Sequence, residues 1–247
     1  MSIRTYTIKD KGKVRNTNQD QAFIYTNVHM DTIGIVCDGM GGHKAGEYAS
    51  LLVGKTILDA FIEADKFEGV DDASAWLYDT IMQANSIVKE KSDSDKDFEG
   101  MGTTLCVTLV TQRCILVANV GDSRAYILKG DTFKGITEDQ TLVNILLKNN
   151  KISEEEAQIH PNKHVLMYAV GTMDDPQVDL YELDRSACTI FMCSDGVYNL
   201  VSDTYLKTVL QGTLKISAKA QSIVDEANAN GGYDNIAIVI LEVDAHE

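Results

Sequence analysis

Residues 37–50 read CDGMGGHKAGEYAS, and this stretch decides how the rest of the chain is interpreted. The hydrophobic run IGIVC ends just before Asp38, four glycines fall within the next eight residues, and a helical pattern begins near Lys44. Asp and Gly commonly end strands, so one such pair indicates no more than a turn. The same arrangement, however, occurs again further along the chain.

Four aspartates stand at the ends of strongly hydrophobic runs. They are Asp38 after IGIVC, Asp122 after ILVANVG, Asp195 after TIFMCS and Asp234 before IAIVIL. If these strand ends converge, the carboxylates repel one another unless cations lie between them. Mg²⁺ and Mn²⁺ prefer such oxygen ligands, and two ions can clamp a phosphoryl group. The pattern therefore indicates either a carboxylate metal centre or four ordinary turns.

Composition narrows the class of protein. The chain has 247 residues, of which 44% are hydrophobic, enough for one large domain. A formal net charge of −15 argues against a nucleic-acid-binding protein. Five cysteines without C-x-x-C spacing indicate buried thiols in a reducing compartment. With no signal-peptide pattern and no run of about 20 apolar residues, we expect a cytoplasmic protein that does not enter a membrane.

Hydrophobic periodicity predicts a mixed fold. Residues 49–61 and 73–88 have helical period, and Ser202 and Ser217 are predicted N-caps of two later helices. Strands are predicted at 22–28, 33–37, 103–110, 114–120, 125–128, 189–193 and 236–241. Only TQR separates the third and fourth strands, which favours a hairpin. We therefore expect an α+β protein with two antiparallel sheets packed on one another and flanked by helices, a four-layer α-β-β-α sandwich.

Eight blocks of the sequence resemble, in order, the motifs of the protein phosphatase 2C (PPM) family in its bacterial form. VCDGMGGHKAGEYAS at 36–50 is the closest match, and the others are VRNTNQD, MGTT, ANVGDSRAY, ITEDQT, HPNKHVLMYAVGT, CSDGVYNLV and GGYDNIAIVI. They span nearly the whole chain, so residues 1–247 are expected to form one phosphatase domain. The family's metal-dependent hydrolysis of phosphoserine and phosphothreonine in proteins is then the expected activity.

The resemblance implies a role for each matching residue. Asp38 would bridge two Mn²⁺ or Mg²⁺ ions, and Gly39 would ligate the first through its carbonyl. Asp195 and Asp234 would be the other carboxylate ligands of the second ion. Asp122 and Asp195 would together bind a third ion more weakly. Arg15 would grip the substrate phosphate, and Asp20 would reach metal-bound water. Asn235, Ser123 and Arg124 are expected to brace loops.

His43 and three other positions depart from the commonest family pattern. Met40 stands where some relatives carry a histidine after the Asp-Gly pair, and the histidine follows three residues later. His43 is thus a candidate catalytic or substrate-binding residue, with a structural role in its loop as the alternative. Gln19, Gln140-Thr141 and Ala237 replace the family's commoner Glu, His-Ser and Thr. None of these changes removes a predicted ligand.

The predicted reaction is attack by a hydroxide that bridges two ions, without a phosphoenzyme. A cysteine mechanism needs C-x5-R, which no cysteine here provides. The alternatives are a catalytically silent relative that binds phosphoproteins and a hydrolase of small phosphoesters. A flap predicted at 142–160 favours protein substrates. We also expect a monomer, and the resemblance implies a cognate Ser/Thr kinase.

Overall fold

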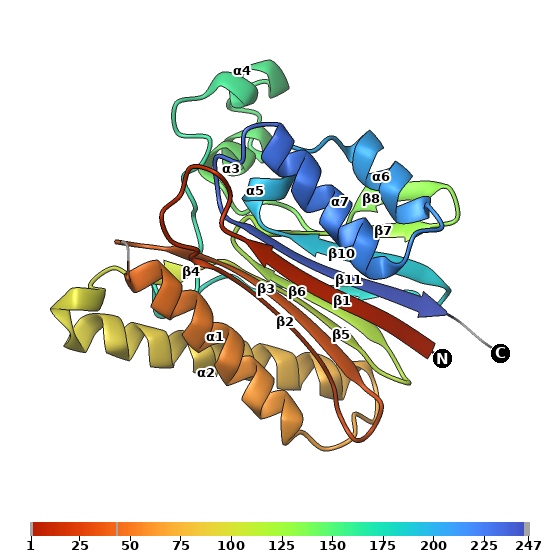
Figure 1. Cartoon of the computed structure of the whole chain (residues 1–247). Helices are drawn as coiled ribbons and strands as arrows, with labels where there is room; N and C mark the ends of the chain where they lie inside the picture. Colours follow the sequence, from red (N-terminus) through yellow and green to blue (C-terminus); the bar gives the residue numbers. More distant parts are fainter. Residues whose placement is uncertain (1, 43, 245–247) are drawn as a thin grey trace.

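The computed structural model describes residues 2–42 and 44–244. Its strands form two antiparallel sheets (Figure 1). Sheet A contains, in spatial order, β1 (Ser2–Asp10), β11 (Ile236–Asp244), β10 (Cys188–Cys193), β7 (Arg124–Lys129) and β8 (Thr132–Gly135). Sheet B contains β2 (Asp20–Thr26), β3 (Thr32–Met40), β5 (Leu105–Val110), β6 (Ile115–Val120) and β9 (Asp179–Leu183), and the short β4 (Gly102–Thr103) pairs with β3.

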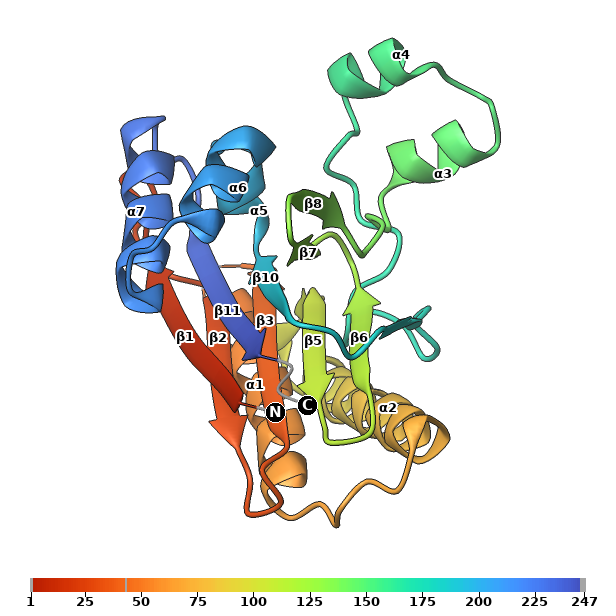
Figure 2. The same cartoon turned by 90° about the vertical axis from the view of Figure 1, so that its right-hand side faces the viewer.

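Helices cover the outer face of each sheet, as Figures 1 and 2 show. Sheet B is covered by α1 (Ala45–Ile62) and α2 (Val70–Ser94), which is followed by the 3₁₀ turn η1 (Lys96–Phe98). Sheet A is covered by α5 (Asp195–Tyr198), α6 (Asp203–Gln211) and α7 (Ile216–Ala229). The remaining pair, α3 (Leu142–Lys148) and α4 (Glu154–Ile159), projects away from the layers. The predicted four-layer α-β-β-α sandwich is confirmed.

Each of the three spaces between layers has its own hydrophobic core. One core joins sheet B to α1 and α2, a second joins sheet A to α5–α7, and a third lies between the sheets. Strand β11 shows how one sequence serves two of them. Ile236, Ile238 and Ile240 point to the helices, whereas Ala237, Val239 and Leu241 point to the other sheet. Both faces are buried, so the strand is continuously hydrophobic instead of alternating.

The strand predictions hold best in the interior of the sheets. β5 and β6 form the predicted antiparallel hairpin. The predicted strand at 22–28 begins earlier, at Asp20, and ends at Thr26. The predicted strand at 103–110 divides into β4 and β5, with Thr104 between them. The sequence did not predict β1, β8 or β9.

The helix predictions hold with one exception. α1 begins at Ala45 with Lys44 as its N-cap, and Ser202 caps α6 by accepting a hydrogen bond from the Tyr205 N–H. Ser217 is not an N-cap, and that prediction was wrong. α7 begins at Ile216 with Lys215 as its cap residue, so Ser217 already lies inside the helix. Across the described part of the chain, no helix combines the length and apolar character that crossing a membrane requires.

Candidate active site

A cavity of about 780 Å³ brings the predicted site residues together. Its lining includes six of them: Arg15, Asp38, Gly39, Asp122, Asp195 and Asp234. They come from five separate segments of the chain, since Asp38 and Gly39 are adjacent, so the fold alone makes the five segments neighbours. Asp20 lies behind the cavity wall and does not line it. His43 lies outside the described residues, so its predicted role is untested.

Asp38 lies near the end of β3, and Thr104 binds both of its backbone polar groups. Its N–H donates to Thr104 Oγ1 at 2.9 Å, and its carbonyl accepts from the Thr104 N–H at 2.9 Å. In the β2–β3 register Asp20 stands directly opposite Asp38. Asp20 is 1% exposed and accepts a 2.6 Å hydrogen bond from Ser194 Oγ. Two carboxylates thus occupy one buried strand pair.

Gly39 lies where β3 passes the start of α1. A Cβ at this position would stand 2.1 Å from the Gly46 carbonyl oxygen and 2.7 Å from the Gln19 carbonyl oxygen. The Gly39 N–H donates to that same Gln19 oxygen at 3.2 Å. Backbone contact between β3 and α1 therefore requires glycine here, independently of any ion that its carbonyl could bind.

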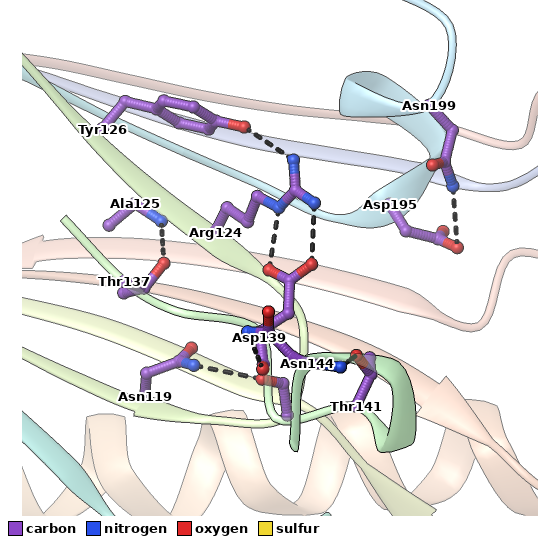
Figure 3. Close-up of polar contacts among 11 residues, drawn as sticks. Asn119, Arg124, Ala125, Tyr126, Thr137, Asp139, Thr141, Asn144, Asp195 and Asn199 are labelled. Carbon is purple, nitrogen blue, oxygen red and sulfur yellow. Dashed lines mark hydrogen bonds and ion pairs between the residues drawn. The ribbon is translucent and has the colours of Figure 1, made fainter. Parts of the chain in front are cut away.

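Asp122 and Asp195 each lie two residues after the end of a strand, β6 and β10 respectively. Asp122 comes after β6 and Gly121, whose φ of +99° suits glycine. Asp195 is the first residue of α5 and accepts a 3.3 Å hydrogen bond from Asn199 Nδ2 (Figure 3). Strand-to-turn geometry thus points both carboxylates into the cavity.

Asp234 forms the opposite wall with Arg15. Arg15 Nη2 lies 2.8 Å from Asp234 Oδ2. The adjacent Asn235 clamps the loop that carries Arg15: its Nδ2 donates to the Lys11 and Thr17 carbonyls, each at 2.9 Å, and its Oδ1 accepts from the Gln19 N–H at 2.8 Å. The predicted loop-bracing role of Asn235 agrees with these contacts.

Burial, and after it the charges of neighbouring acids, raises the pKa of Asp20, Asp38 and Asp122. Burial is the largest cause at Asp38, followed by the charges of Asp20 and Asp195, and its pKa lies well above the usual range. Burial, opposed by the Ser194 hydrogen bond, raises the pKa of Asp20 to about 7. Burial and the Asp195 charge raise the pKa of Asp122 to about 7. These buried acids carry more negative charge than the cavity neutralises.

The donor set fits hard divalent cations. Carboxylates are the ligands that Mg²⁺ and Mn²⁺ prefer, and a cation would relieve the repulsion that raises the pKa values. Gln19 also lines the cavity, and its Nε2 is buried without a hydrogen-bond partner. Within the described ranges, however, no three Asp, Glu, His or Cys side chains form a ready-made metal cluster. One of the acids, Asp234, is already paired with Arg15.

A polar network beside the cavity fixes the turn after Asp122. Arg124 Nε and Nη2 donate to the two carboxylate oxygens of Asp139 at 2.8 and 2.7 Å, as Figure 3 shows. The Arg124 guanidinium also lies 3.6 Å from the centre of the Tyr198 ring, in α5. Ser123 Oγ lies 2.7 Å from Thr104 Oγ1. Both residues brace the loop, in agreement with the prediction.

Sequence reasoning missed part of the cavity wall. Lys163 and His164 line it from the chain that returns after α4, and Asn199, Leu200 and Tyr233 line it from two other loops. Burial and the Asp234 charge raise the pKa of Asp195, and the neighbouring His164 is among the groups that oppose this rise. HPNKHVLMYAVGT was recognised as a family block, but nothing in its residue pattern indicates that it folds back to the site.

Comparison with known proteins identifies the chain's relatives. A profile described as Protein phosphatase 2C matches residues 12–229. The serine/threonine phosphatase stp of Listeria monocytogenes (serotype 4b, strain F2365) is 36% identical over 236 residues, which is 95% of this chain and 94% of that protein. Protein phosphatase PhpP of Streptococcus pneumoniae (strain D39) is 30% identical, with 97% of both chains covered.

Solved structures agree. The Streptococcus agalactiae serine/threonine phosphatase superposes with a TM-score of 0.91 at 30% identity, covering 98% of this chain and all of that one. The catalytic domain of the phosphatase PstP, in complex with two manganese ions, gives a TM-score of 0.82 at 29% identity, covering 98% of this chain and 99% of that one. Profile, sequence and fold therefore lead to one conclusion: this chain belongs to the protein phosphatase 2C family, a family of hydrolases.

Proposed function

We propose that the chain hydrolyses phosphoserine and phosphothreonine in proteins, and that it does so without a phosphoenzyme. The observation that carries this proposal is the cavity itself, where one arginine faces four aspartates from separate strand ends. The aspartates suit divalent ions, and the arginine suits the phosphate of the substrate. Membership of a phosphatase family, with a manganese-bound relative of the same fold, supports the assignment.

The ligands that we propose are Asp38 for both ions, the Gly39 carbonyl for the first, and Asp195 and Asp234 for the second. Asp122 with Asp195 would hold a weaker third ion. Bound Mn²⁺ or Mg²⁺ supplies hydroxide near neutral pH and neutralises charge on the phosphoryl group. Asp20 lies behind Asp38, which forms part of the cavity wall. We propose that from there Asp20 orients metal-bound water.

Arg15 has the geometry for binding the phosphate. Its planar guanidinium stands in the cavity with about half of the side chain exposed, and Asp234 already orients it. The Asp234 hydrogen bond raises the pKa of Arg15, so its charge persists at any working pH. The arginine can therefore donate two parallel hydrogen bonds to phosphate oxygens, which a lysine cannot do.

The size and surroundings of the cavity favour a protein substrate. A cavity of about 780 Å³ exceeds what a phosphate needs, and Lys163 and His164, which follow the flap, line part of it. We also propose a cytoplasmic monomer that opposes a cognate Ser/Thr kinase in signalling. The resemblance alone suggests the kinase, and the acidic composition is consistent with a protein that binds neither nucleic acid nor membrane.

The central test measures phosphate release from a phosphothreonine peptide with Mn²⁺, with and without EDTA. We expect chelation to abolish release, and Asp195→Ala to lower turnover by orders of magnitude while the fold stays intact by circular dichroism. Asp65→Asn, which changes an exposed acid outside the cavity, is the matched control and should retain activity. Activity that survives full chelation would exclude the metal-dependent reaction.

The same assay separates the alternatives. A silent phosphoprotein-binding relative would bind the peptide without turnover in Mn²⁺. A small-phosphoester hydrolase would release phosphate faster from nucleotides than from the peptide. We expect neither outcome, because Lys163 and His164, which follow the flap and line the cavity, give a peptide more surface to contact than a nucleotide would use.

Arg15→Lys tests the phosphate-binding role. Lysine keeps the charge and loses the planar fork, so we expect kcat/KM to fall roughly 10- to 100-fold. Arg4→Lys is the control, because Arg4 is also exposed and ion-paired but lies on β1 outside the cavity. Equal kcat/KM in the Arg15 variant and in the wild type would remove Arg15 from the proposed mechanism.

A further inference from the structure

The buried amide of Gln140 joins three segments that meet beside the active-site cavity. The side chain is 6% exposed and has three hydrogen bonds. Its Oε1 accepts from the Gly121 N–H at 2.8 Å. Its Nε2 donates to Asp179 Oδ2 at 2.8 Å and to the Gln177 carbonyl at 3.2 Å. One side chain thus links the turn before Asp122 to the segment that enters β9.

The backbone of Gln140 joins the two ends of the flap. Its N–H donates to the Gly121 carbonyl at 3.0 Å, and its carbonyl accepts from the Met167 N–H at 2.8 Å. The next residue, Thr141, pairs with Leu166 in an isolated bridge. The Leu142 N–H then donates to the Val165 carbonyl at 2.9 Å. The outgoing and returning chains of the flap are therefore closed against each other at Gln140.

Gly121 is the point where this arrangement reaches the cavity. Both of its backbone groups bond to Gln140, the N–H through the side chain and the carbonyl through the backbone. Asn119 Nδ2 adds a second donor to that carbonyl at 3.1 Å. The following residue is Asp122, whose carboxylate lines the cavity. The direction in which Asp122 leaves the turn therefore depends on the contacts that Gln140 makes.

We infer that Gln140 is a positioning residue that fixes the root of the flap and the Asp122 turn as one unit. It touches neither substrate nor reacting atoms. With the root fixed, motion is confined to residues 142–165, which contain the flap. The Asp122 side chain then keeps its orientation into the cavity. The inference rests on the proposed function for its kinetic consequences, but its structural consequence can be measured without metal or substrate.

An amide suits this role because its two ends have opposite hydrogen-bonding character. The oxygen must accept from a backbone N–H, and the nitrogen must donate to a carboxylate and a carbonyl. Glutamate has the same shape but cannot donate to Asp179, and it would bring a second carboxylate against it. Leucine removes all three bonds. Histidine keeps one donor and one acceptor, so it should preserve part of the link.

The first measurement is hydrogen exchange of backbone amides in residues 118–124 and 142–165 of the metal-free full chain. We expect Gln140→Leu and Gln140→Glu to speed exchange roughly tenfold or more there, because leaving buried polar groups unpaired is costly. Gln140→His should give intermediate exchange. If Gln140→Leu does not fold, the exchange rates of Gln140→His and the wild type are compared instead, and exchange should be faster in Gln140→His.

Asn85 provides the matched control. It is also a buried amide with three hydrogen bonds, to Gly171, Met173 and Asp174, but it lies on α2 and shares no hydrogen-bond partner with Gln140. Asn85→Leu should lower global stability without selective exchange in the two segments. Equal exchange in the Gln140 and Asn85 variants would overturn the inference, as would wild-type exchange in all of them.

The kinetic consequence is a second readout. The Gln140 variants should show a several-fold higher KM for the phosphothreonine peptide and a higher Mn²⁺ concentration for half-maximal rate. A small aryl phosphate, which fits within the cavity, should show the Mn²⁺ effect with little change in its KM. Faster exchange in the Gln140 variants, together with an inactive wild-type chain, would support the positioning role while contradicting the proposed function, so the two failures are distinguishable.

Discussion

At the scale of single residues, Gly39 shows how packing and chemistry can require the same amino acid. The sequence suggested that glycine lets the backbone approach an ion. The structure adds an independent reason, because the Gly46 carbonyl of α1 occupies the space that a Cβ would need. The two reasons can be separated, since stability responds to packing whether or not metal is present.

Gly39→Ala is therefore expected to lower the free energy of unfolding of the metal-free protein by about 1–3 kcal/mol, as overpacking usually does. Gly42→Ala is the matched control, since a Cβ at Gly42 meets nothing within 4 Å. Urea unfolding followed by circular dichroism measures both. Equal stability of the two variants would mean that the β3–α1 contact adapts.

The residues that the sequence predicted and those that it missed differ in one physical respect. The four strand-end aspartates carry a local signal, because each directly adjoins a long hydrophobic run. Lys163 and His164 carry none, since they reach the cavity only when the chain folds back after α4. Local patterns report burial and turns, but they do not report which distant loops meet.

At the scale of elements, the missed strands are those at or near the sheet edges. β1, β8 and β9 are edge strands, and their residues are mostly exposed or partly buried. Hydrophobic runs identify strands with two buried faces, such as β5, β6 and β11. These three edge strands are polar enough to resemble loops, whereas the fourth edge strand, β2, carries the hydrophobic run that predicted it.

The two predicted N-caps allow the observed starts of α6 and α7 to be tested by alanine substitution. Ser202 Oγ accepts from the Tyr205 N–H at 3.3 Å, whereas Ser217 lies inside α7. Ser202→Ala should lower the free energy of unfolding by about 1 kcal/mol, the usual cost of losing a cap. Ser217→Ala should change it little or raise it slightly, because alanine favours helix interiors. A larger loss at Ser217 than at Ser202 in thermal unfolding would contradict the observed helix start.

At the scale of the whole molecule, stability and metal binding are coupled through charge. Asp20 has a pKa of about 7 in the folded, metal-free protein against an ordinary value of 3.8. Between these pH values the folded state holds a proton that the unfolded state has lost. Stability therefore falls as pH rises through this window and levels off above it. Asp122, whose pKa is also raised to about 7, acts in the same direction.

Urea unfolding of the metal-free protein should accordingly give a smaller free energy at about pH 8 than at about pH 5. Mn²⁺ should restore stability at the higher pH, because the cation then neutralises the carboxylates that protons neutralise at lower pH. Asp20→Asn should flatten the pH dependence, since the amide does not titrate. Metal-free stability that rises across this range would show that other groups dominate.

The pairing of β1 with β11 has a consequence for how the molecule is made. Ser2 stands opposite Asp244, so the first strand is completed by the last one. This contact joins residues that are 242 positions apart in the sequence, and closing it is slow. During synthesis β1 stays unpaired until β11 emerges. Until then β10 can pair with β7 but lacks its second neighbour. A truncated or stalled chain would leave both strands with open edges, which are templates for aggregation.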